Sequence, residues 1–125
     1  MAMEATKENF AEIIDNNDIV VLDFWAPWCG PCQSFAPIFE AAAETHKDSA
    51  AFVKINTEEE QELAAHFQIR SIPTLMVFRE QIVVFAQPGV LPESALGQLL
   101  EQVKGLDMDQ VRKEIAEQQL SQSAN

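Results

Sequence analysis

The chain has 125 residues and a formal net charge of −12, because 20 Asp and Glu stand against only 8 Lys and Arg. Hydrophobic residues make up 47% and charged residues 22%, which is ordinary for one globular domain that builds its own core. A chain this acidic repels phosphate backbones, so we expect no nucleic-acid partner.

The same charge disfavours self-association without a specific contact, so we expect a monomer, with a weak dimer as the alternative. The first ten residues contain Glu4 and no apolar run, so they do not resemble a secretory signal. No apolar stretch is long enough to span a membrane. We therefore expect a cytoplasmic protein.

The first half of the chain predicts two helices and two strands, over residues 6–15, 19–25, 32–46 and 51–56. Thr6 is the candidate N-cap of the first helix. Residues 19–25 form an apolar run broken only by Asp23 and rich in β-branched and aromatic side chains, which is typical of a buried central strand.

The second half predicts a helix over 58–67, an antiparallel hairpin of strands 74–78 and 82–85, and a helix over 92–104 that ends at Gly105. The hairpin turn at 79–81 lacks the usual Asn-Gly type of turn residue. Strands that alternate with helices indicate an α/β fold, with a central mixed sheet of four to five strands flanked by helices.

Residues 106–125 form a helical extension to the domain of residues 1–105. Asp107 caps a helix to about Gln119, and a polar tail runs from Ser121 to Asn125. An apolar stripe on this helix consists of Met108, Val111 and Ile115. We expect the stripe to pack on the domain; the alternative is the interface of a binding or co-chaperone module.

The two cysteines, Cys29 and Cys32, lie three positions apart. A disulfide that closes so small a loop stabilises little, so the pair indicates catalysis or metal binding. At the start of a helix, free backbone N–H groups favour a thiolate, which is the attacking species in disulfide exchange. We expect Cys29 to attack and Cys32, one turn further on, to resolve. Gly30 permits a tight turn, and Pro31 suits the first helical turn.

A zinc site is the alternative for this pair, but structural zinc needs four ligands. Only His46 and His66 are available to complete it, on separate predicted helices and without paired spacing. The local chemistry therefore favours redox over metal, and a metal shared between two chains is a minor alternative.

Three more residues accompany the pair. Asp23 is either a buried proton acceptor for Cys32 or a carboxylate on a solvated strand face. Lys54, in the next strand, is its candidate charge partner or an ordinary strand-edge charge. Pro73 precedes a strand, and the sequence does not settle whether its peptide bond is cis.

The run from Val21 to Cys32, which ends in Trp28-Cys29-Gly30-Pro31-Cys32, and the loop from Ile69 to Thr74 resemble the active-site strand and the cis-proline loop of the thioredoxin family. The resemblance covers about residues 6–104. It implies a central sheet flanked by helices, Cys29 as nucleophile and Cys32 as resolving thiol. It also implies proton transfer through Asp23, a cis Pro73 facing the cysteines, and a docking surface that includes Trp28, Ile72 and Gly89.

The resemblance further implies a protein thiol–disulfide oxidoreductase that acts on disulfide-containing proteins. Gly-Pro between the cysteines is what the reducing members carry, and thioredoxin is the known example with a potential of about −270 mV. The implied electron donor is an NADPH-dependent flavin thioredoxin reductase, and no cofactor is expected on this chain. Departures from the family pattern are a missing or very short first strand, Gln33 in place of a Lys, and Ser71 in place of a Gly.

Overall fold

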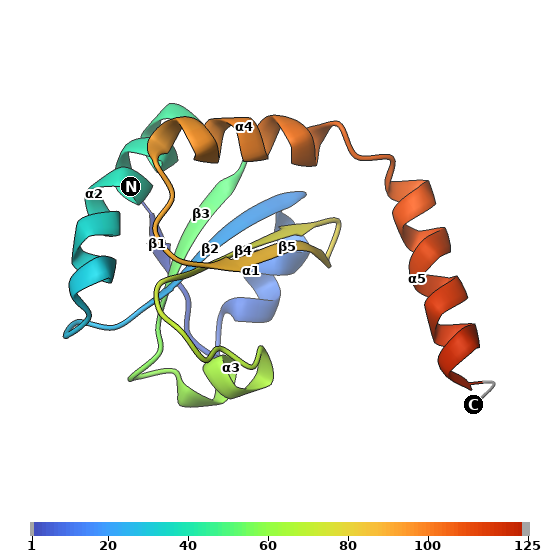
Figure 1. Cartoon of the computed structure of the whole chain (residues 1–125), viewed down its shortest axis with the longest axis horizontal. Coiled ribbons are helices and arrows are strands. Elements are labelled where there is room, and N and C mark those ends of the chain that lie inside the picture. The colour runs from blue at the N-terminus through green and yellow to red at the C-terminus, as the bar shows by residue number, and fades with distance from the viewer. Residues whose placement is uncertain (1, 124–125) are drawn as a thin grey trace.

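A five-stranded mixed sheet forms the centre of the molecule in the computed structural model, which describes residues 2–123 (Figure 1). The strands are β1 Met3–Glu4, β2 Ile19–Trp25, β3 Ala51–Asn56, β4 Thr74–Arg79 and β5 Ile82–Pro88, in the order β1-β3-β2-β4-β5. The strands β1, β3 and β2 are parallel, whereas β4 is antiparallel to both β2 and β5. The helices are α1 Phe10–Asn16, α2 Gly30–Thr45, α3 Gln61–His66, α4 Glu93–Lys104 and α5 Met108–Ser123. The predicted fold class is therefore confirmed.

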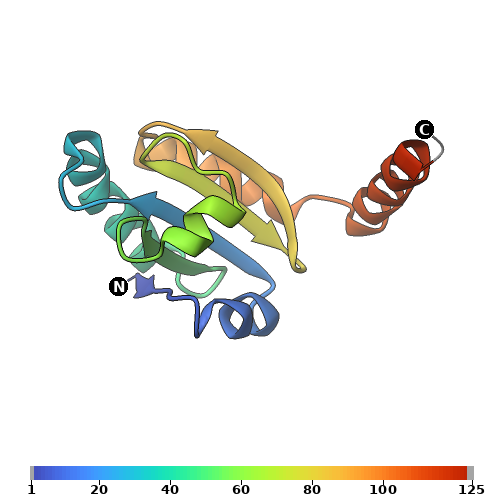
Figure 2. The ribbon, with the colours of Figure 1, turned by 90° about the horizontal axis from the view of Figure 1, so that it is seen from below.

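Two hydrophobic cores lie on opposite faces of the sheet, beneath the helices that cover each face in Figure 2. One core joins α2 and α4 to the sheet through side chains such as Phe39 and Leu100. The other joins α1 and α3 through Ile14, Leu63 and their neighbours. Successive residues of β2 point alternately into the two cores, so the central strand is covered on both faces. This double burial is why β2 is a nearly continuous apolar run.

The edge strand β1 has only two residues and pairs with β3. The sequence indicates a first strand that is either missing or very short, and the structure shows a very short one. At the other edge, the β4–β5 hairpin turns through Glu80 and Gln81, with φ values of 50° and 69°. Both residues have a left-handed backbone conformation, which Gly or Asn adopts at a lower energetic cost.

The helix starts differ from the predictions where side chains fold back on the backbone. Thr6 does not cap α1, because its backbone N–H donates to Asn9 Oδ1 at 2.7 Å and the helix begins at Phe10. The start of α3 shifts from the predicted residue 58 to Gln61. Asn56 Oδ1 accepts from the backbone N–H groups of residues 58 and 59, at 3.0 and 3.4 Å, and holds them in a turn.

The last helix, α5, stands away from the body of the molecule (Figure 1). Its first residue, Met108, is buried, while Val111 and Ile115 are half-buried beside β5. The apolar stripe therefore contacts its own domain mainly at the start of the helix. Arg112 Nη1 binds Glu80 Oε1 at 2.7 Å. The predicted polar tail is helical as far as Ser123, and its residues 124–125 lie outside the described residues.

Candidate active site

The cysteine pair lies where β2 has ended and α2 begins. Cys29 and Cys32 form a disulfide with their Cα atoms 5.2 Å apart. Cys29 is itself the N-cap of α2, because its Sγ accepts the backbone N–H of Cys32 at 3.2 Å. The helix consequently starts at Gly30, two residues before the predicted start. The sulfur of Cys29 is thus held at the positive end of a 16-residue helix.

Exposure alone does not distinguish the two cysteines, since Cys29 is 5% and Cys32 3% exposed. They differ in their backbone contacts. Cys29 Sγ faces a helix-end N–H group, whereas Cys32 lies within the helix, packed with Ala26. The adjacent Trp28 is 69% exposed, so the loop beside the disulfide presents a large aromatic surface to solvent.

The loop before β4 closes over Cys29 from the other side. The peptide bond between Ile72 and Pro73 is cis, and the Ile72 carbonyl oxygen lies 3.7 Å from Cys29 Sγ. Gly89 donates its backbone N–H to the Pro73 carbonyl at 2.8 Å, with a φ of 106° that a side chain rarely tolerates. The structure therefore brings Cys29, Ile72, Pro73 and Gly89 together from three separate parts of the chain.

Of the two residues between the cysteines, Pro31 has its expected place in the helix and Gly30 does not have the expected conformation. Gly30 is the first residue of α2 and does not have a positive φ, so the expected use of glycine for a tight turn is wrong. No atom lies within 4 Å of the position that a Cβ at Gly30 would take. Pro31 lies in the first turn of the helix, as expected. Both are exposed next to Trp28.

Asp23 is fully buried in β2, which rules out the solvated strand face considered for it. Neither carboxylate oxygen has a hydrogen-bond partner among the described residues. Burial raises the pKa of Asp23 from its ordinary value of 3.8 to about 7, and the positive charge of Lys54 opposes this rise. Asp23 and Lys54 are partners in the β2–β3 register, so the charge of Lys54 acts on Asp23 from the neighbouring strand without a hydrogen bond to it.

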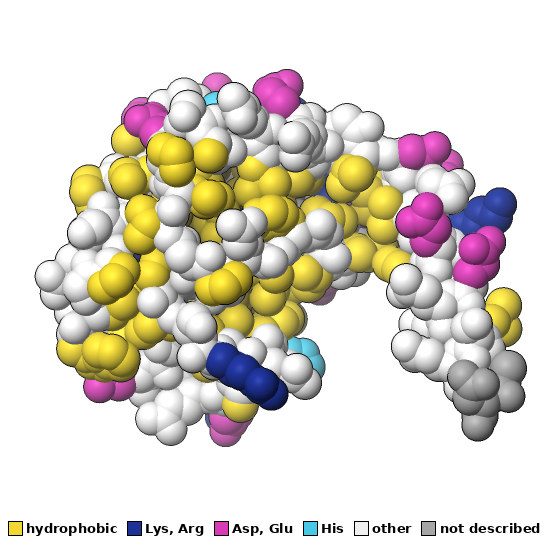
Figure 3. Space-filling view, viewed as in Figure 1, with side chains coloured by type: hydrophobic (Ala, Val, Ile, Leu, Met, Phe, Trp, Pro, Cys, Tyr) yellow, Lys and Arg dark blue, Asp and Glu magenta, His cyan; other side chains and the backbone are white. Residues whose placement is uncertain are grey.

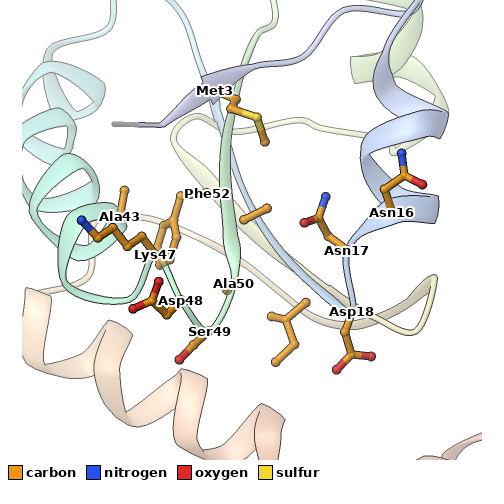
Figure 4. A pocket seen from close by; sticks show the side chains of 12 residues that line it. Met3, Asn16, Asn17, Asp18, Ala43, Lys47, Asp48, Ser49, Ala50 and Phe52 are labelled. Carbon is orange, nitrogen blue, oxygen red and sulfur yellow. The ribbon is translucent and has the colours of Figure 1, made fainter.

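A hollow of about 500 Å³ lies at the end of the sheet opposite the cysteine pair (Figure 4). It lies beside Ile19 and Ala51, the first residues of β2 and β3, whereas Cys29 follows the last residue of β2. The face seen in Figure 3 instead carries apolar side chains from the β2–α2 loop across to the strands. The disulfide itself is nearly buried, and the side chains exposed beside it are those of Trp28 and Pro31, with the backbone of Gly30.

Among residues 2–123, no group of three or more His, Cys, Asp or Glu side chains could hold a metal ion. The rings of the two histidines lie near phenylalanine rings. The ring centroids of His46 and Phe52 are 6.5 Å apart, and those of His66 and Phe67 are 4.8 Å apart. No helix in the described part of the chain is both long and apolar enough to cross a membrane.

A family model described as Thioredoxin matches residues 1–102. The chain belongs to the thioredoxin family. It is 56% identical over 117 residues to "Putative thioredoxin 2" of Streptomyces coelicolor, a match that covers 94% of this chain and 87% of that protein. It is 41% identical to "Thioredoxin 1" of a Nostoc species, with 80% and 94% covered. A mutant thioredoxin from Halobacterium salinarum has a similar structure, with a TM-score of 0.77, 35% identity, and 84% and 92% coverage.

With the Cys29–Cys32 pair in place, membership of this family makes the thioredoxin a protein thiol–disulfide oxidoreductase. The comparisons do not favour a binding or co-chaperone module. Family members act on disulfide-containing proteins, are usually reduced by a thioredoxin reductase and generally bind no cofactor. Sequence reasoning missed the capping role of Cys29, although Pro two residues after a candidate cap is a recognisable signal.

Proposed function

We propose that Cys29 is the nucleophile and Cys32 the resolving thiol in the reduction of protein disulfides. The Cys29 thiolate attacks one sulfur of the substrate disulfide, and the other substrate sulfur leaves as a thiolate and takes a proton. The Cys32 thiolate then attacks Cys29, forms the Cys29–Cys32 disulfide and releases the second substrate sulfur. Two electrons pass to the substrate. The observation that carries these roles is the Cys32 N–H donated to Cys29 Sγ at the start of α2, because this contact favours the charged sulfur.

Asp23 serves as the proton acceptor for Cys32 in this scheme. A carboxyl whose pKa is about 7 exchanges protons near neutral pH, whereas an ordinary carboxyl would already be ionised. Lys54 limits the rise of that pKa and so keeps a useful fraction of Asp23 ionised. The complete burial of Asp23 in β2, the strand that leads to the cysteine loop, supports this role.

An extended substrate segment docks on the open surface around the disulfide. Trp28 supplies exposed aromatic area, and Gly30 and Pro31 lie beside it. On the opposite side, the backbone of Ile72 and the loop at Gly89 flank Cys29, with the cis Pro73 between them. An open face of this kind suits many protein substrates rather than one small molecule.

The electron donor in this proposal is a flavin-containing thioredoxin reductase that draws on NADPH. The thioredoxin works as a cytoplasmic monomer, with a weak dimer as the alternative. Residues 1–105 carry the reaction, and residues 106–125 are an extension outside it.

Reduction of insulin by dithiothreitol, with and without the protein, tests the cysteine roles. Cys29→Ser abolishes the catalysed rate, whereas Cys32→Ser still attacks and accumulates a mixed disulfide at Cys29, detectable by mass spectrometry. Unchanged turnover in the Cys29→Ser protein, or accumulation of a mixed disulfide at Cys32 in that protein, would contradict the assignment. Turnover with NADPH and a thioredoxin reductase tests the donor separately.

A further inference from the structure

A second surface hollow lies next to the cis-proline loop, on the α3 side of the hairpin. It has a volume of about 220 Å³ and is lined by Phe67, Arg70, Thr74, Met76, Ala86 and Gln87, with their neighbours. We call it the Arg70 pocket. Thr74 and Met76 are buried, whereas Arg70 and Gln87 are exposed, so the pocket has an apolar floor and polar edges.

The Arg70 pocket continues directly from the proposed docking surface. Ser71 and Thr74 belong to its lining and flank the Ile72–Pro73 pair that lies against Cys29. Pro88, also in the lining, is the register partner of Thr74 and precedes Gly89. An extended chain rises about 3.3 Å per residue. A substrate segment beside Ile72 would therefore bring a side chain one or two residues from the attacked cysteine to this pocket.

The charge around the Arg70 pocket is unusual for this protein. Its lining contains one basic residue and no acidic one, in a chain of net charge −12. Four other hollows formed by the described residues each have at least one Asp or Glu in their lining. The pocket is thus a local site where a substrate carboxylate is attracted rather than repelled.

Arg70 is also free to bind such a group. Its guanidinium makes no ion pair or hydrogen bond with another residue in the described range 2–123, unlike Arg79 and Arg112. A guanidinium recognises a carboxylate through two parallel N–H donors. The pocket volume is below the roughly 300–1,000 Å³ of typical small-molecule sites, so it fits a side chain better than a cofactor.

We infer that the Arg70 pocket receives an acidic side chain of the protein substrate, with the carboxylate on Arg70 and the aliphatic part over Met76. The inference rests on the proposed docking of an extended segment beside Ile72. It makes Arg70 a specificity-determining residue, which selects among disulfides by the charge near the attacked cysteine and takes no part in the sulfur chemistry.

Two synthetic peptides test this inference. Each has one internal disulfide, and they differ only in carrying Glu or Lys two positions from each cysteine, on both sides. Their second-order rate constants are measured by stopped flow with the fully reduced wild-type protein. We expect the Glu peptide to react roughly three- to tenfold faster at about 150 mM salt, where repulsion by the net charge of the chain is screened beyond about 8 Å and the direct contact with Arg70 persists, and the preference to shrink at higher salt.

The variants Arg70→Gln and Arg70→Glu locate the effect. The first should remove the preference, and the second should reverse it. Lys113→Gln on α5 makes the same charge change as Arg70→Gln, far from the docking surface, and should keep the wild-type preference. Equal rates for both peptides in the wild type, or an equal loss of preference in Lys113→Gln, would overturn the inference. Failure of both peptides to react would instead contradict the proposed docking, and the inference with it.

Discussion

The ammonium group of Lys54 lies 4.6 Å from the centre of the Trp25 indole ring. This cation–π contact fixes a positive charge on the strand next to Asp23, the register partner of Lys54. The raised pKa of Asp23 is thus set by two opposed influences, burial that raises it and Lys54 that lowers it. Substitutions at Asp23 and at Lys54 therefore change the pH dependence of stability in different ways.

Stability of the oxidised protein should fall as the pH rises from about 4 to 7. Asp23 binds its proton more tightly in the fold, with a pKa of about 7, than in the unfolded chain, with a pKa of 3.8. The stabilisation is complete below pH 4 and is lost through pH 7, by up to roughly 4 kcal/mol. Asp23→Asn should flatten this part of the profile in urea unfolding measured at several pH values. A wild-type slope retained in Asp23→Asn would contradict the assignment.

Lys54→Gln should move the same profile to higher pH, because loss of the positive charge raises the pKa of Asp23 further. The midpoint of the stability loss therefore lies above the wild-type midpoint. Lys47→Gln is the matched control, since Lys47 is exposed and paired with Glu44 at 3.0 Å. A shift of equal size in the control would show that net charge, not the Lys54 contact, is responsible.

Gln81→Gly should stabilise the protein by about 1 kcal/mol. Gln81 has a φ of 69°, and glycine adopts this conformation without the strain that a Cβ introduces. Gln81→Ala keeps the Cβ and should give no gain. Thermal unfolding of the three proteins measures the difference, and equal gains for Ala and Gly would show that the left-handed turn is not strained.

Arg79 holds the end of α4 against the hairpin. Its Nη1 donates to the carbonyl groups of Val103, Lys104 and Leu106, at 2.6, 3.1 and 3.0 Å. Arg79→Met removes this shared donor, although the Val103 carbonyl keeps the backbone N–H of Leu106, and should cost about 2 kcal/mol of unfolding free energy. Arg112→Gln breaks two exposed ion pairs, with Glu80 and Asp109, and should cost much less. Comparable losses in urea unfolding would contradict the capping role of Arg79.

Met108 supplies a buried contact at the start of α5. Met108 is 5% exposed, whereas Leu120 on the same helix is 71% exposed. Met108→Ala should destabilise the protein by about 2 kcal/mol, and Leu120→Ala should change little. Insulin reduction should stay at the wild-type rate in both, because residues 106–125 lie outside the proposed reaction. A loss of turnover in folded Met108→Ala would show that the extension takes part.

The strands were predictable because they depend on local pattern. The residues of β2 and of β3 occupy the predicted ranges, since continuous burial requires continuous apolar sequence. The starts of α1, α2 and α3 were not, because Asn9, Cys29 and Asn56 divert backbone N–H groups through their own side chains. Such contacts depend on a turn geometry that periodicity does not encode.

In the candidate site too, the features carried by neighbouring residues were predictable, and the contacts between distant segments were not. Cys29 and Cys32 are recognisable because their chemistry lies within four consecutive residues. The contacts of Cys29 Sγ with the Ile72 carbonyl and of Gly89 with Pro73 join segments 16 or more positions apart, so no local pattern predicts them. The resemblance to the family was what placed these residues near the cysteines. The Arg70 pocket is likewise formed by two separate segments, and no local motif marks it.

The position of α5 has a practical consequence for anyone who immobilises or labels this thioredoxin. The helix leaves the body at the side away from the β2–α2 loop that carries the disulfide (Figure 1). A dye, a bead or a fused partner attached through the exposed face around Leu120 would leave the sulfur atoms accessible to large proteins. The same attachment at the loop near Trp28 would block them.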